Sequence, residues 1–236
     1  SITVTTATPG GTQTEKITRT PSYTAPGTLN PLLPGTLQYS VDTQAKGGTG
    51  QFDWARERLR VLSADTPNAA IREYERIRES SPDGLSDAQE YGLALARMQA
   101  NQPAVAATGL AALLLKHPDS LWVALALGEA ESRSGKTTAA NQRFTALQRQ
   151  FHDNRALALT FAQVLNEQGS RESGQRAQAV LRPLLGNAGN DPFFQKNFAR
   201  ANELAGDLAR AGEAYAEAAF LNGRPEQALI QLQNLK

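Results

Sequence analysis

Cysteine is absent from this sequence of 236 residues, and histidine occurs only twice. A chain without thiols forms no disulfide and offers no cysteine nucleophile, so it is compatible with an oxidising or a reducing compartment. Neither His117 nor His152 has a histidine or a carboxylate four residues away, as a zinc-ligand pair on a helix requires. We therefore expect no metal site and no cofactor in this chain.

Motifs of common hydrolases and nucleotide-binding proteins are missing as well. The sequence contains no His-Glu-x-x-His zinc motif and no Gly-x-Ser-x-Gly nucleophile elbow. The run Gly135-Lys136-Thr137 lacks the upstream glycine of a phosphate-binding loop, so we interpret it as a turn. Nothing in the sequence predicts that this chain is itself an enzyme.

The chain has neither a large net charge nor a long hydrophobic run. Lys and Arg number 24 and Asp and Glu number 23, which gives a net charge of +1. Nucleic-acid binding depends on a basic face, so we expect no nucleic-acid partner. No stretch approaches the roughly 18 apolar residues of a membrane helix, and Ser1 begins a polar Thr-rich stretch without the features of a signal peptide.

Composition changes sharply near residue 50. Residues 1–50 are rich in Thr, Pro and Gly, a mixture that opposes helix formation, and we expect an irregular or linker segment there. Ser1–Thr6 alternates Ile2 and Val4 with polar residues and could form a short strand, which would need a partner to persist. Residues 51–236 have helical periodicity and are expected to form one domain.

Turn residues recur at a fixed interval within that domain. Asn101, Gly135 and Gly169 lie 34 positions apart, and Gly206 follows after 37. Before each turn come the pairs Leu93-Ala94, Leu127-Gly128, Phe161-Ala162 and Phe198-Ala199. After each turn come Ala106 and Leu110, Ala140 and Phe144, Ala177 and Leu181, and Ala211 and Tyr215. The third copy carries three extra residues, which we place around Glu172–Gly174.

This pattern matches the tetratricopeptide repeat, in which helical hairpins stack side by side. We predict an all-α superhelix of about eleven helices. The first two helices span Phe52–Leu62 and Pro67 to about Ser80. The others are expected at about Ser86–Ala100, Pro103–Lys116, Asp119–Ser134, Lys136–Gln150, Asn154–Gln168, Gly174–Leu185, Pro192–Ala205, Asp207–Leu221 and Pro225–Leu235. Ser86, Asp119 and Asp191 are suited to cap helix N-termini.

A concave groove is the expected functional surface of such a superhelix. Its solvent-facing positions are predicted on the first helix of each hairpin: Tyr91, Leu95, Met98, Trp122, Glu129, Arg133, Gln163, Asn166, Glu167, Lys196, Arg200 and Glu203. Mixed aromatic and polar side chains on one curved face suit the binding of an extended polypeptide. The alternative interpretation is that Trp122 and Leu95 pack between repeats, and that Arg133 and Lys196 belong to an ordinary solvated face.

Four stretches are distinctive in their local sequence. They are Glu90–Leu95 followed by Met98–Asn101, Phe52–Leu62, Asn154–Gly169, and Ala216–Ala228 with Leu232. Together they resemble the C-terminal repeat region of the BepA family of periplasmic zinc metallopeptidases and chaperones of Gram-negative bacteria. The resemblance implies a periplasmic protein that docks onto outer-membrane protein assembly machinery and presents unfolded outer-membrane proteins to a peptidase.

The resemblance does not extend to catalysis. The peptidase domain of the family carries a His-Glu-x-x-His motif, and no residue of this chain matches it, so zinc is expected only in a peptidase domain outside this chain. Two functions remain open: a protein-binding module for assembly factors or unfolded clients, or the regulatory half of an active zinc endopeptidase. A stand-alone repeat scaffold in a cytoplasmic complex is a third interpretation.

Overall fold

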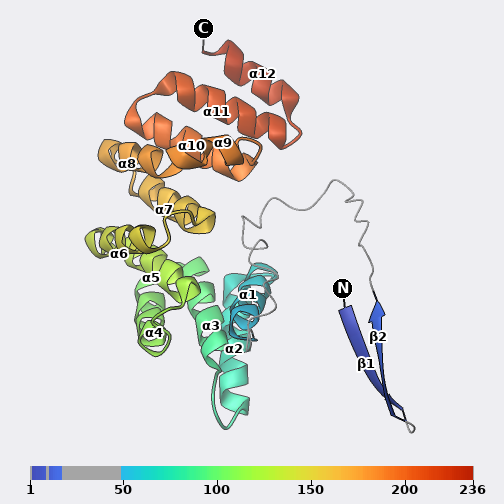
Figure 1. Cartoon of the computed structure of the whole chain (residues 1–236). Coiled ribbons are helices and arrows are strands. Elements are labelled where there is room, and N and C mark those ends of the chain that lie inside the picture. The colour runs from blue at the N-terminus through green and yellow to red at the C-terminus, as the bar shows by residue number, and fades with distance from the viewer. Residues whose placement is uncertain (1, 9–10, 18–48, 236) are drawn as a thin grey trace. The chain divides into compact units, whose positions relative to one another are not determined.

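The computed structural model describes residues 2–8, 11–17 and 49–235, with side chains described from residue 51 to 235 (Figure 1). The chain divides into two units, Ser1–Leu32 and Leu33–Lys236, and each is described by itself. The predicted domain boundary near residue 50 lies next to residues outside the described part of the chain.

A β-hairpin forms in the first unit. Strand β1 (Ile2–Thr8) pairs antiparallel with β2 (Gly11–Ile17), in a register that places Ile2 opposite Ile17 and Val4 opposite Glu15. Residues 2–8 and 11–17 thus form the strand pairing that the sequence allowed as an alternative, and residues 18–48 of the segment expected to be irregular lie outside the described residues. The alternation of Ile2 and Val4 does mark a strand, because the following residues supply the pairing partner that a lone strand lacks.

The second unit is helical throughout its described length. Its elements are α1 (Thr49–Leu62), α2 (Pro67–Ser80), α3 (Asp87–Gln99), α4 (Pro103–Lys116), α5 (Leu121–Arg133), α6 (Thr137–Gln150), α7 (Arg155–Gln168), α8 (Arg171–Leu181), the 3-10 turn η2 (Arg182–Leu184), α9 (Leu185–Ala188), α10 (Pro192–Ala205), α11 (Leu208–Leu221) and α12 (Pro225–Gln233). Successive helices pack as hairpins α3–α4, α5–α6, α7–α8 and α10–α11 (Figure 1). The chain therefore has a tetratricopeptide-like helical-repeat fold.

The predicted turns are confirmed by their backbone geometry. Asn101, Gly135, Gly169 and Gly206 have φ angles of 59°, 84°, 72° and 91°, which is the left-handed conformation. Each of them is followed two residues later by the first residue of the second helix of its hairpin. Glycine reaches this conformation without a steric penalty and asparagine does so more readily than most residues, which explains the recurring choice.

Side-chain caps fix several helix starts. Ser86 forms a capping box with Gln89 at the start of α3, as the sequence predicts, and Asp191 caps α10 ahead of Pro192. At α5 the cap is Ser120 and the predicted Asp119 lies one residue before it.

The three extra residues of the third repeat do not lie where the sequence placed them. Helix α8 begins at Arg171, where Ser170 and Ser173 form a capping box, so Glu172–Gly174 is its first turn. The insertion lies at the other end of the helix, as η2 and α9, and with the short α9 the described residues form twelve α-helices where about eleven were expected. Gly174 rather than Ala177 therefore takes the small-residue position, since a Cβ there would lie 2.5 Å from the Cβ of Leu204.

Buried apolar side chains form two clusters. The first cluster combines side chains of α1 to α5, including Trp54, Leu110 and Leu127. The second combines side chains of α6 to α10, including Phe144 and Phe161. We call these the N-terminal cluster and the C-terminal cluster.

Candidate protein-binding surface

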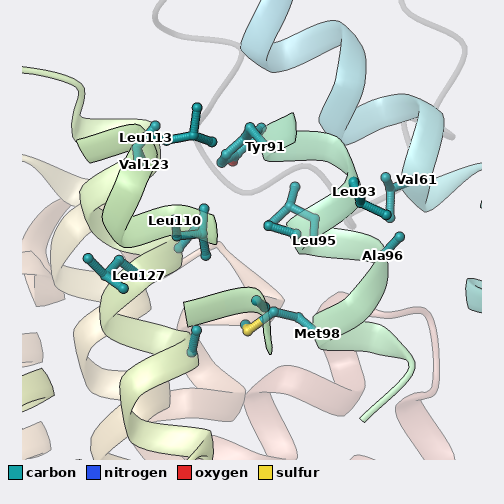
Figure 2. Close-up of a cluster of buried hydrophobic side chains, with 14 of the residues drawn as sticks. Val61, Tyr91, Leu93, Leu95, Ala96, Met98, Leu110, Leu113, Val123 and Leu127 are labelled. Atoms are coloured by element: carbon teal, nitrogen blue, oxygen red, sulfur yellow. The ribbon is translucent and has the colours of Figure 1, made fainter. Parts of the chain in front are cut away.

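The predicted groove residues fall into a buried group and an accessible group. Tyr91, Leu95, Met98 and Asn166 are between 0 and 7% exposed, so their prediction as solvent-facing residues is wrong. In Figure 2, Tyr91, Leu95 and Met98 lie among Leu110, Leu113, Val123 and Leu127 of the next helices, whereas Leu93 and Ala96 lie toward Val61 of α1.

The reason is the packing of neighbouring helices. Tyr91 contacts the ring of Trp54 in α1, and Leu95 and Met98 lie among side chains of α4 and α5, so these apolar side chains become part of the core. Asn166 is also buried, but its contact is a hydrogen bond: its Nδ2 donates to the carbonyl oxygen of Asn197 in α10 at 2.9 Å. The largely apolar side chains of Tyr91, Leu95 and Met98 were the sign in the sequence that other helices cover this face of α3.

The accessible group is brought together on the first helices of the later hairpins. It consists of Trp122, Glu129, Arg133, Gln163, Glu167, Lys196, Arg200 and Glu203, all of them half-buried or exposed. Trp122 also packs against the N-terminal cluster, which agrees with the alternative interpretation of that residue. Protein binding by the remaining predicted residues stays a prediction.

An ion pair joins two neighbouring first helices. Arg133 of α5 donates from Nε and Nη2 to the two carboxylate oxygens of Glu167 in α7, at 3.2 and 3.1 Å. Gln163 donates to Oε1 of the same carboxylate at 3.1 Å. This bond to Glu167 raises the pKa of Arg133 further above its ordinary value, so the guanidinium stays charged. The pair therefore places a fixed, bidentate contact on the accessible surface.

The pKa of the Glu129 carboxyl group is shifted by its surroundings. Burial raises its pKa above the ordinary value, while the positive charges of Arg58 and Arg133 oppose that rise. Arg58 belongs to α1 and was missed in the sequence, because α1 does not follow the repeat register and has no groove position to assign. Alternating charges from Arg58 through Glu129 and Arg133 to Glu167 thus extend over α1, α5 and α7.

At the C-terminal end the surface is more exposed. Arg200 pairs with Glu203 within α10 at 2.8 Å, and the hydroxyl of Tyr215 in α11 donates to the same carboxylate at 2.9 Å. Both contacts stabilise the charged carboxylate and lower the pKa of Glu203, with the bond from Arg200 as the larger cause. Lys196 lies on the same helix with an exposed side chain. These groups offer one exposed cation beside a paired Arg and Glu.

The two histidines lie in turns between repeats. His117 is the C-cap of α4 and its Nε2 lies 2.8 Å from Oδ2 of Asp87, while His152 lies beside Asp153 at 2.8 Å. Within the part of the chain that the structure describes, no group of three or more His, Asp or Glu residues could hold a metal ion. None of the helices in the same part is long and apolar enough to cross a membrane.

Comparison with known proteins adds little beyond this geometry. No protein-family model matches the sequence, and no curated protein matches it. Among solved structures, a chain named MamA MSR-1 C2 is similar over 74% of this chain and 95% of its own length, with 16% sequence identity and a TM-score of 0.49. A likeness at that level carries no argument about function, and the helical-repeat assignment rests on the hairpins and turns described above.

Proposed function

We propose that this chain is a protein-docking repeat module that holds an extended segment of a partner protein against α5, α7 and α10. The observation that carries the proposal is the accessible row of Glu129, Arg133, Gln163, Lys196 and Arg200 on consecutive first helices. Polar and charged side chains at a regular spacing can contact a partner's backbone and side chains along its length. Such contacts give orientation and specificity, whereas buried positions cannot.

The finer proposal concerns the identity of the partner. The sequence resemblance to the BepA repeat region supports a periplasmic role in which the module docks onto outer-membrane protein assembly machinery and receives unfolded outer-membrane proteins. The open surface carries charges of both signs, which suits polar and extended clients. Under this proposal the chain needs no cofactor of its own.

A second candidate is that the chain is the regulatory half of an active zinc endopeptidase. Phe52, Leu59 and Leu62 favour it, because these side chains of α1 are 67, 49 and 52% exposed and lie on one face by their helical spacing. The resemblance makes α1 the helix beside a peptidase domain, and such a domain would cover this face. An upstream His-Glu-x-x-His motif in the same reading frame would decide for this candidate, and its absence there would favour the stand-alone scaffold.

The docking surface can be tested by reversing two exposed charges. We expect Lys196→Glu combined with Arg200→Glu to weaken binding of a urea-unfolded outer-membrane porin, and of purified outer-membrane assembly complex, by about tenfold or more, since charge reversal introduces repulsion. Binding would be measured by fluorescence anisotropy with labelled protein at fixed ionic strength.

The matched control is Lys136→Glu with Arg149→Glu, which makes the same charge change on two exposed residues, the N-cap of α6 and a residue of its last turn. This control should bind as the wild type does. Equal affinities for the two double variants would place the docking surface elsewhere, and no binding of either probe by the wild type would contradict the finer proposal.

A further inference from the structure

The hairpin α5–α6 packs against the hairpin α7–α8 partly through side chains that are only partly buried. Two positions of α3 hold Tyr91, whose ring contacts Trp54 of α1, and Met98, and these side chains are 0 and 6% exposed. In α7 the equivalent positions hold Leu159 and Asn166, which are 1 and 6% exposed. In α5 they hold Leu125 and Ser132, and both of these side chains are partly exposed. Leu125 packs against the C-terminal cluster, so the junction between α5 and α7 keeps an apolar contact there but lacks the full burial seen at these positions in α3 and α7.

The second helices show the same change at an offset of 34 residues. Ala107 is buried in α4, and Leu114 of α4 packs against the N-terminal cluster. Their equivalents in α6 are Asn141 and Gln148, which are polar and half-buried. Only Ala140 and Phe144 are buried among the side chains of α6. The apolar side chains at these two positions of α4 are thus replaced by polar ones in α6.

Phe144 is a fully buried aromatic ring at this junction, and the partly buried Leu125, Leu147 and Phe151 also pack against the C-terminal cluster. Phe144 stacks on Phe161 of α7 with ring centroids 5.0 Å apart, and its ring edge contacts Gly128 of α5. The two apolar clusters meet here, because the buried side chains of α5 belong to the N-terminal cluster and Phe144 belongs to the C-terminal one. The Phe144 ring lies where the two clusters meet, so a rotation of one cluster relative to the other would be centred near this ring.

Polar contacts make the remaining connections between these hairpins. Asn141 and Gln168 exchange two amide hydrogen bonds of 3.2 and 3.0 Å. Arg176 of α8 donates to the hydroxyl of Thr145 in α6. On the groove side the connection is the bidentate pair of Arg133 with Glu167. These polar groups are half-buried or exposed, so water can replace their partners. Breaking these contacts therefore costs little free energy compared with opening an apolar core.

We propose that the superhelix bends at the junction of α5–α6 with α7–α8, and that the ion pair between Arg133 and Glu167 is the latch that sets the curvature of the groove. The role in binding rests on the proposed function, but the bending does not. Solvation of the latch releases the two bodies to rotate about Phe144. Because both latch residues are exposed on the proposed docking surface, a partner that binds either one shifts the same equilibrium.

The absence of cysteine permits a direct distance measurement. Ala111 of α4 and Ala209 of α11 are exposed and lie on opposite sides of the joint, so both would be changed to Cys and spin-labelled. Pulsed electron–electron double resonance would measure the distance between the two labels in the otherwise wild-type protein and in Glu167→Gln. This substitution removes the negative charge and keeps nearly the same side-chain shape. We expect a broader distance distribution and a change of about 1.4- to 5-fold in the ratio of bent to straight forms, the range that an exposed ion pair supplies. Salt at 1 M should broaden the wild-type distribution in the same way.

Two controls separate bending from general loosening. Glu73→Gln removes a comparable carboxylate, one that pairs with Arg76 within the single helix α2, and should leave the distribution unchanged. Labels at Ala179 of α8 and Ala209 lie on the same side of the joint and should keep their distance in every variant. An unchanged distribution between Ala111 and Ala209 in Glu167→Gln would overturn the proposal, as would equal broadening of the control pair. Neither result depends on a partner, so the docking function is tested separately.

Discussion

Gly128 of α5 shows how closely the two helices of a hairpin approach each other. A Cβ atom at this residue would lie 2.5 Å from Cε2 and 2.8 Å from Cζ of Phe144. That ring cannot easily move away, because it is fully buried and stacked on Phe161. The small residue is therefore required by tertiary packing, although glycine weakens the helix that contains it.

We expect Gly128→Ala to lower the free energy of unfolding by up to about 2 kcal/mol. Overpacking costs about 1–3 kcal/mol, which exceeds the helix-propensity gain of about 1 kcal/mol. Gly109 of α4 is the control, because a Cβ there meets nothing within 4 Å, and Gly109→Ala should stabilise by about 0.5–1 kcal/mol. Urea unfolding midpoints would measure both, and stabilisation by Gly128→Ala would contradict the packing argument.

Helix α1 illustrates how an element outside the repeat register is held. Trp54 is 7% exposed and makes edge-on contacts with the rings of Tyr91 and His117, each at a centroid distance of 5.4 Å. The buried carboxylate of Glu57 accepts a hydrogen bond of 2.9 Å from the hydroxyl of Tyr74 in α2. That contact also raises the pKa of Tyr74, after burial as the larger cause. One aromatic anchor thus holds α1 against α3, and one buried polar contact holds it against α2.

Removing the anchor should release this element before the rest. We expect Trp54→Ala to cost about 3–5 kcal/mol, because it leaves a large cavity at the interface of α1 with α3. Hydrogen exchange followed by mass spectrometry should show faster exchange in α1. Phe52→Ala is the control, since Phe52 is 67% exposed and its loss should change stability by less than about 0.5 kcal/mol. Equal effects of the two changes would mean that α1 is held by other contacts.

At the scale of the whole helical unit, stability is divided between two apolar clusters. Helical repeats contact mainly their neighbours, so a weak junction limits how far a local change spreads. The N-terminal cluster contains Leu110 and the C-terminal cluster contains Leu165, and both side chains are fully buried. The two halves of the unit should therefore lose protection separately when one cluster is damaged.

We expect Leu110→Ala to cost about 2–5 kcal/mol and to speed hydrogen exchange in α3 to α5 more than in α10 and α11. Leu165→Ala should give the reciprocal pattern. Site-resolved hydrogen exchange under native conditions would measure both. If either variant accelerates exchange evenly along the unit, the two clusters form one cooperative core and the junction is not weak.

The local sequence determined the hairpins themselves. Glycine or asparagine at the turns has a local conformational reason, and the spacing of small and large apolar residues follows from helix geometry, so both could be predicted. The insertion was misplaced because two interpretations of the third repeat, with Gly174 or with Ala177 as the small residue, fit the local pattern. Only the contact of Gly174 with Leu204 in a distant helix distinguishes them.

Which side of each helix faces solvent was decided by the tertiary structure. Periodicity shows that Tyr91 and Asn166 share an equivalent face, but it does not show what lies opposite that face. Trp54 of α1 packs on Tyr91, Asn166 is bonded to α10, and α1 also adds Arg58 to the surface from outside the repeat. Contacts between hairpins depend on relative positions over many residues, so a local pattern fixes the elements while their stacking decides the accessible surface and its weakest junction.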